Sequence, residues 1–209
     1  MRAYPLLLLL FLWGEAAFSQ AFGANPPSVK WRQINTPETR LIYPRGLDST
    51  AQRIAGIVHY LNRHTSVTSG VDHRKISIVL QNQTTNANGY VGLAPWRSEF
   101  LLTPQFNSFE LGSLPWAENL ALHEYRHVQQ YMNYRKGLSK LAYIILGEEG
   151  QAVANNAAIP NWFFEGDAVF QETAVSGQGR GRLPFFFNGY RSLWEADKKY
   201  SFMKLRNGS

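Results

Sequence analysis

The chain has 209 residues, enough for one domain with a sizeable core, and its hydrophobic fraction of 44% is that of a folded globular protein. It has no cysteine, which excludes disulfides, thiolate metal sites, cysteine nucleophiles and a lipidated N-terminal cysteine. The net charge of +6 is scattered without a dense basic block, so we expect a solvated surface and no nucleic-acid partner.

The N-terminus has the pattern of a secretory signal peptide over residues 1–19. Arg2 gives a positive start, residues 6–13 form an apolar core, and residues 17–19 (Ala-Phe-Ser) form a small-x-small cleavage site. The apolar run is too short to span a bilayer comfortably, although an uncleaved anchor is the alternative. We expect an exported protein, periplasmic or secreted, with no integral membrane span after signal removal. Residues 20–28 are interpreted as a linker.

The next part of the chain favours strands with one helix among them. β-Branched and alternating apolar residues predict strands at 29–34, 39–43, 76–81, 89–93 and 99–103. Apolar residues three and four apart predict a helix over 49–64, capped by Asp48 or Ser49. His59 and His64 in this helix are five residues apart and do not share a face well, so we do not expect them to be ligands.

The strongest motif is His123-Glu124-Tyr125-Arg126-His127, in a segment predicted to be helical between Pro115 and Gly137. On a helix, His123 and His127 lie one turn apart on one face, where two imidazoles can take two corners of a Zn²⁺ shell. Glu124 is only one residue round, so its carboxylate can reach a metal-bound water without being a ligand. The alternative is a solvated helix face carrying two unrelated histidines.

A second helix is expected after Pro160, capped by Asn161, and it carries the candidate third ligand, Glu165. A glutamate amid aromatic residues is costly to bury unless something neutralises it, and a dication would do so. The alternative is that Glu165 pairs with the N-terminal dipole of its helix. Glu148 and Glu149 are further candidates, ranked lower because they lie in a glycine-flanked break.

Three other segments carry weaker signals. Residues 138–146 are apolar and predict either a buried helix or a hydrophobic lid, too short for a membrane span. Residues 176–182 are glycine-rich with two arginines but lack the GK[ST] of a phosphate loop, so we expect a flexible surface loop. Residues 190–196 predict a short helix.

The sequence HEYRH followed by WFFEGDAVFQE resembles the gluzincin metallopeptidases, in which HExxH supplies two histidine ligands and a glutamate supplies the third. The W-x-x-E-G-x-A-x-x-x-E pattern is similar to the second zinc helix of zinc aminopeptidases and related bacterial peptidase-like domains. The resemblance implies His123, His127 and Glu165 as ligands of one Zn²⁺. It implies Glu124 as the general base.

The same resemblance assigns outer roles to two acids. Glu172 matches an acid behind the ligands, and it, or with less support Asp167, would accept the N–H of a zinc-bound histidine. Residues 128–164 make a longer spacer than the compact aminopeptidase pattern, so an inserted helical hairpin or loop is expected. For the oxyanion donor, Tyr125 and Tyr190 are both conceivable.

The resemblance therefore implies an α+β, zincin-like catalytic domain over 29–209, with a small mixed sheet, an HExxH helix and a second ligand helix. Segment 89–103 is expected either to flank the cleft as an edge strand that pairs with a peptide or protein substrate, or to be an ordinary strand. Related exported proteins often continue into a β-propeller, so we expect the chain to be the N-terminal part of a longer protein. The rival interpretations are a catalytically silent zinc scaffold or binding module, and a structural envelope protein without metal.

Overall fold

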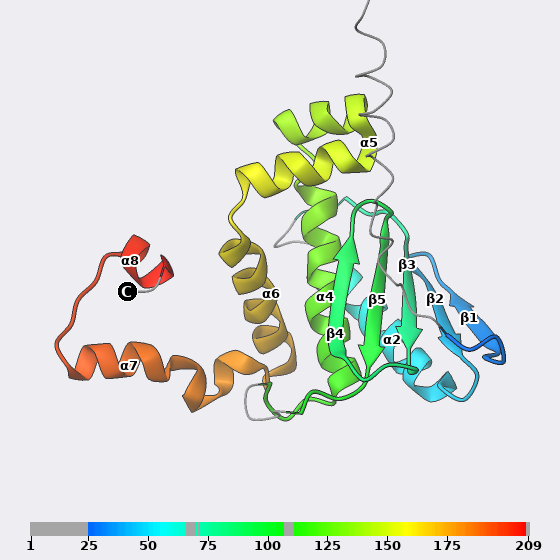
Figure 1. Ribbon diagram of the computed structural model, residues 1–209, viewed down its shortest axis with the longest axis horizontal. Coiled ribbons are helices and arrows are strands. Elements are labelled where there is room, and N and C mark those ends of the chain that lie inside the picture. The colour runs from blue at the N-terminus through cyan, green and yellow to red at the C-terminus, as the bar shows by residue number, and fades with distance from the viewer. Residues whose placement is uncertain (1–24, 66–69, 71, 107–110, 208–209) are drawn as a thin grey trace, which may run out of the picture.

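Five strands form one mixed sheet, and helices α2 and α4 pack together against it (Figure 1). The computed structural model describes residues 25–65, 70, 72–106 and 111–207, so the predicted signal peptide at 1–19 lies outside the described residues. The predicted linker at 20–28 is described only from Asn25, whose amide donates to Gln81 Oε1 at 2.8 Å. The mixture of helices with this sheet agrees with the predicted α+β class.

The sheet has the strand order β1-β2-β3-β5-β4, with β2, β3 and β5 parallel and the outer strands β1 and β4 antiparallel to their neighbours. The strands are β1 Trp31–Asn35, β2 Thr39–Pro44, β3 Ile76–Gln81, β4 Ala87–Gly92 and β5 Arg97–Leu102. All five predicted strands are present. The last two begin two residues earlier than predicted because Ala87 and Arg97, which carry little strand signal of their own, pair with Leu102 and Gly92.

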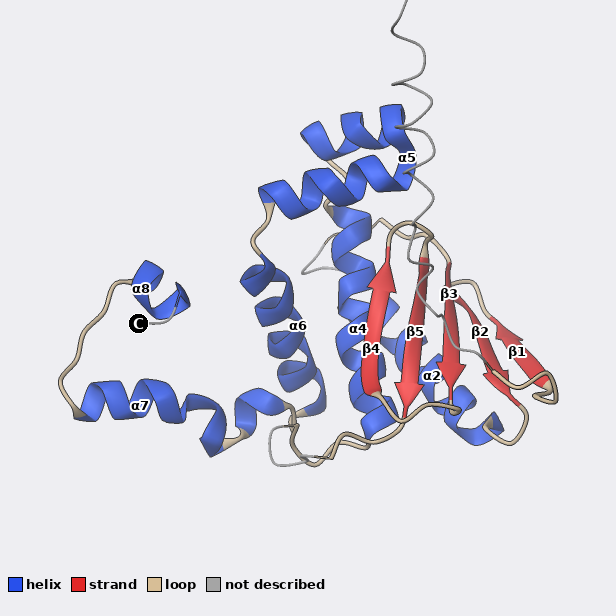
Figure 2. Cartoon of the chain, viewed as in Figure 1, coloured by secondary structure: helices blue, strands red, loops and turns tan. Residues whose placement is uncertain are grey.

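Helices make up the rest of the architecture, as Figure 2 shows. The α-helices are α2 Asp48–His64, α4 Trp116–Asn133, α5 Gly137–Ala158, α6 Asn161–Ser176, α7 Asn188–Glu195 and α8 Phe202–Asn207. Two short 3₁₀ helices, η2 Arg180–Arg182 and η3 Pro184–Phe187, connect α6 to α7. Helix α6 lies beside α4, so the two helices with candidate ligands are neighbours in space (Figure 1).

The core lies between the sheet and helices α2 and α4. Its fully buried members include Leu41, Ile78, Leu80 and Phe100 from the strands and Ile54, Val58 and Leu61 from α2. Helix α4 adds Leu120, Ala121, Leu122, Tyr125 and Val128. Each such side chain contributes roughly 1.5–3 kcal/mol by leaving water, which holds α4 firmly against the sheet.

Helix α5 is a helical hairpin inserted between the two ligand helices, one of the two forms expected for the long spacer. It bends at Gly147, whose φ of 66° few other residues adopt. Its two segments pack closely: a Cβ on Gly150 would lie 2.3 Å from the carbonyl oxygen of Ala142, and Ser139 Oγ donates to Asn155 Oδ1 at 2.8 Å. The predicted helix over 138–146 is therefore present, but its large aliphatic side chains are exposed, whereas Ser139 is buried against the second segment.

The C-terminal elements lie apart from the sheet (Figure 1). Helix α7 corresponds to the helix predicted at 190–196 and begins two residues earlier, at Asn188. Among the described residues, no helix combines the length and apolar character that crossing a membrane requires.

Candidate metal centre

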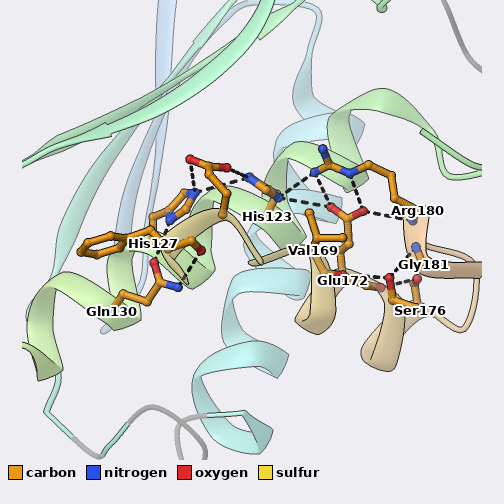
Figure 3. Close-up of polar contacts among 11 residues, drawn as sticks. His123, His127, Gln130, Val169, Glu172, Ser176, Arg180 and Gly181 are labelled. Carbon is orange, nitrogen blue, oxygen red and sulfur yellow. Dashed lines mark hydrogen bonds and ion pairs between the residues drawn. The ribbon is translucent and has the colours of Figure 1, made fainter. Parts of the chain in front are cut away.

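Helix α4 places His123 and His127 side by side, as the i, i+4 spacing predicts (Figure 3). Their ring centroids are 4.9 Å apart and the ring planes are nearly perpendicular, at 82°. The two Nε2 atoms lie 3.3 Å from each other. Both side chains are almost wholly buried because α4 is enclosed by strand β4 on one side and α6 on the other.

Glu165 of α6 completes a group of three ligating atoms. Its Oε2 lies 3.2 Å from His123 Nε2, and its Oε1 lies 3.8 Å from His127 Nε2. In a tetrahedral site whose ligands are about 2.0–2.1 Å from the ion, neighbouring ligand atoms are about 3.3 Å apart. The separations of 3.2 and 3.3 Å match that spacing, and the separation of 3.8 Å, to the other oxygen of the same carboxylate, is longer. His123, His127 and Glu165 could therefore hold a metal ion.

Glu124 lines the same cavity, of about 420 Å³, without belonging to the ligand group. Strand β4 forms the opposite wall and comes very close, since a Cβ on Gly89 would lie 2.8 Å from Glu124 Oε1. Burial raises the pKa of Glu124 to about 7, and the charge of Glu165 adds to the rise while His123 opposes it. Glu124 is thus a carboxyl group poised to gain or lose a proton near neutrality.

His123 is held from behind by Glu172, whose Oε2 lies 3.2 Å from His123 Nδ1 (Figure 3). Glu172 is fully buried, and Arg180 donates to both of its carboxylate oxygens, through Nε and Nη2, at 2.8 Å each. Burial alone would raise the pKa of Glu172, but the hydrogen bonds from Arg180 and His123 lower it to about 2. Glu172 is therefore a permanent carboxylate facing the outer nitrogen of His123.

His127 is held through an amide instead. Its Nδ1 lies 2.8 Å from Gln130 Oε1, and Gln130 Nε2 donates to Asp167 Oδ2 at 2.7 Å. Arg126 in turn donates to both oxygens of Asp167, at 2.7 and 2.9 Å. The sequence analysis allowed Asp167 to accept the N–H of a histidine directly. In the structure Gln130 lies between the two residues, so Asp167 contacts His127 only through Gln130.

The two histidines consequently differ in charge in the metal-free protein. Burial alone would lower the pKa of His123, but hydrogen bonds to Glu165 and Glu172 raise it to about 9. The pKa of His127 is lowered, first by burial and then by the positive charge of His123. A metal ion would therefore have to displace a proton from His123 and none from His127 near neutral pH.

Two site residues were missed by the sequence analysis, Arg180 and Gln130. The interpretation of residues 176–182 as a flexible surface loop is wrong for Arg180, whose guanidinium is paired with Glu172 and lines the cavity. Its neighbours explain this position: a Cβ on Gly179 would lie 2.7 Å from Thr173 Cα, so only glycine lets the loop turn back onto α6. Gln130 was detectable as the residue one turn beyond His127 on the same helix.

The other candidates lie outside the ligand group. Glu148 is ion-paired with Arg74 at 2.5 Å and accepts the backbone N–H of Trp96 at 3.1 Å. Tyr125 is buried, with its hydroxyl donating to Asn62 Oδ1 at 3.0 Å. Tyr190 is 47% exposed on α7. The tyrosines that do line the cavity are Tyr90 and Tyr131.

The chain was compared with known proteins at three levels. No family model, no curated protein and no solved structure matches it.

Proposed function

We propose that this protein is a zinc-dependent metallopeptidase of gluzincin type. The proposal rests above all on one observation: two imidazole nitrogens and the carboxylate of one glutamate converge beside a buried glutamate that is not one of them. A purely structural site has no use for that fourth residue. The resemblance of HEYRH and WFFEGDAVFQE to gluzincins supports the same reading.

Zinc is the ion that best fits the donor set. Two histidines with one glutamate leave one tetrahedral position open, which is the arrangement of catalytic zinc sites. When bound, Zn²⁺ would bring the pKa of a coordinated water to about 7 and polarise a substrate carbonyl. His123 and His127 would bind through Nε2, because Glu172 and Arg180 contact Nδ1 of His123 and Gln130 contacts Nδ1 of His127.

Glu124 is proposed as the general base. It would take a proton from the attacking water and later deliver it to the leaving amine of the cleaved peptide bond. In the metal-free protein burial raises the pKa of this carboxyl group to about 7, and a bound dication would favour its deprotonated form, which is the form that a general base needs. Its burial beneath Gly89 keeps the carboxylate in one place.

Strand β4 supports an extended peptide as the substrate. Among the described strands, it is the last in the sheet order and pairs with β5 on one side only. Residues 87–91 of this strand form a wall of the cavity next to the ligands. Main-chain hydrogen bonds from such an edge can hold an extended segment of almost any sequence. We also propose that the protein is exported, on the sequence pattern of residues 1–19 alone. That a β-propeller follows this domain is proposed on the family resemblance alone.

The test pairs metal analysis with a peptide-library digest of the parent and the Glu124→Gln variant. The parent should contain one zinc and cleave peptides, whereas the variant should keep the zinc and lose about 10²–10⁴-fold in turnover. A zinc-loaded parent that cleaves nothing in the library would favour the silent scaffold. A protein that binds no metal would favour the structural alternative.

A further inference from the structure

The outer face of the α5 hairpin is a continuous aliphatic surface. Leu138, Leu141, Ile144 and Ile145 are 81%, 52%, 69% and 67% exposed. They recur three and four residues apart, so they lie on one side of the first helical segment. Helix α5 stands at the end of the molecule beyond the sheet (Figure 1), and nothing in the described part of the chain covers this face.

The charges on the N-terminal side of this face are all positive, and the exposed Glu149 lies beyond the bend. Arg135, Lys136 and Lys140 lie at the start of the hairpin, and residues 137–147 contain no acid. Arg135 stacks over the Tyr143 ring, 4.6 Å from its centroid. Glu148, at the bend, is neutralised by Arg74. The aliphatic surface is thus flanked by cations on its N-terminal side.

Further exposed apolar residues lie at the beginning of α6 and on the second hairpin segment. Trp162 and Phe163 are 44% and 43% exposed, and Val153 of the second hairpin segment is 70% exposed. Residues 150–164 carry no charge at all. An exposed apolar surface of this extent marks an interaction site.

We propose that the outer face of the α5 hairpin docks onto an anionic lipid bilayer, lying in its interfacial layer. Surface helices that do this carry aliphatic and aromatic residues on one face and lysine or arginine beside it. A protein partner fits less well, because lysine is depleted in protein interfaces relative to the rest of the surface, whereas Lys136 and Lys140 lie beside this face. The docked helix would lie along the surface without crossing it.

Docking would also orient the metal centre. Helix α5 joins α4 to α6. Tyr131, near the end of α4, and Asn156, in the second segment of α5, both line the cavity. The cavity would then open close to the membrane surface. This consequence rests on the proposed function, but the lipid binding itself does not.

The test is co-flotation with vesicles of phosphatidylcholine alone and of phosphatidylcholine mixed with phosphatidylglycerol. The chain is used from Gln20 onward, because residues 1–19 are the predicted signal peptide and their apolar run at 6–13 would itself bind lipid. The parent should bind the anionic vesicles and bind the neutral ones more weakly. The double variant Leu141→Ser/Ile145→Ser should lower that binding at least about tenfold.

Two further variants separate the causes. Lys136→Gln/Lys140→Gln should remove most of the preference for anionic vesicles, and high salt should do the same. Trp194→Ser, at an equally exposed apolar residue (73%) on the distant α7, should change nothing. Thermal unfolding and zinc content, measured on every variant, should match those of the parent because all the altered side chains are exposed.

Three outcomes would overturn the proposal. The first is that the parent binds neither type of vesicle. The second is that Trp194→Ser weakens binding as much as the hairpin variant, which would indicate non-specific adsorption. The third is lipid-independent self-association that Leu141→Ser/Ile145→Ser abolishes, which would make a second copy the occupant of this face. A loss of peptidase activity without a change in flotation would concern the proposed function alone.

Discussion

His127 Nδ1 lies 2.8 Å from the side-chain oxygen of Gln130, and the orientation of that amide is fixed by its other end. Gln130 Nε2 donates to Asp167 Oδ2 at 2.7 Å and to the carbonyl of Phe164 at 3.0 Å, both of which are acceptors only. The amide oxygen therefore faces His127, so Nδ1 carries the proton and Nε2 offers its lone pair to the ligand group. One side chain thus sets the tautomer of His127 and ties α4 to residues of α6 on both sides of Glu165.

Gln130→Ala should accordingly weaken metal binding by about 10–100-fold, the usual effect of removing the partner of a ligating histidine. Chelator competition on the purified protein measures this. The matched control is Gln129→Ala, which removes an adjacent buried glutamine whose amide bonds to Thr65 and Leu61 and not to a histidine. Equal metal affinity in the two variants would show that Gln130 contributes only to packing.

Glu165→Ala should reduce metal affinity more severely, by over about 100-fold, since it removes a ligand and not a partner of one. Inductively coupled plasma analysis of protein dialysed against trace zinc gives the occupancy. Glu148→Ala should leave the occupancy unchanged, because Glu148 is engaged with Arg74 and Trp96. If the Glu165 variant kept full occupancy, another group would have to supply the third ligand.

The features predicted correctly from the sequence are those whose geometry depends on local spacing along the chain. The i, i+4 histidines, the neighbouring Glu124 and the helix carrying Glu165 all follow from helical periodicity, and the five strands follow from β-branched patterns. Arg180 and the Gln130–Asp167 contact depend on how α6 packs against α4 and how the following loop folds back. Such packing is a tertiary property that no short window of sequence encodes.

The exposure of the α5 hairpin illustrates the same limit. Its apolar residues 138–146 predicted either a buried helix, because large aliphatic side chains usually lie inside, or a hydrophobic lid. In the fold, Ser139 and Ala142 form the inner side of the hairpin, and Leu138 and Leu141 face outward. Residue type was enough to predict the helix. Which face of the helix turns inward depends on the close packing of Gly150 against the backbone carbonyl of Ala142.

The buried Glu172–Arg180 pair should make the metal-free protein sensitive to acid. Because the folded-state pKa of Glu172 is about 2, below its ordinary value of 4.5, its contribution to stability is complete above pH 4.5 and is lost as the pH falls toward 2. Glu172→Gln should therefore lower the free energy of unfolding at neutral pH, by about 3 kcal/mol, and flatten its dependence on pH within that window. Urea unfolding at a series of pH values, with chelator present, measures both effects.

Arg32→Gln is the control for this experiment, since it breaks an ion pair with Asp48 that is exposed to solvent and therefore contributes little to stability. Its unfolding free energy should stay close to that of the parent at neutral pH. A Glu172→Gln protein whose stability fell with pH as steeply as the parent would mean that other carboxylates govern the acid transition.

The variant Gly89→Ala tests the contact between strand β4 and Glu124, the proposed general base. A Cβ at this position would lie 2.7 Å from Leu120 Cδ2 and 2.8 Å from Glu124 Oε1, so Gly89→Ala must move either β4 or the Glu124 carboxylate. Since neither movement touches the three ligands, zinc affinity should stay within about twofold of the parent. Turnover of peptides should fall by about 10²-fold, because a displacement of about 1 Å in a catalytic group has an effect of that size.

Gly56→Ala, on the exposed side of α2 with nothing within 4 Å, should alter neither quantity. Full peptidase activity in Gly89→Ala would mean that the cavity wall can yield without disturbing Glu124, and a parallel loss of zinc would place the strain on the ligand helix itself.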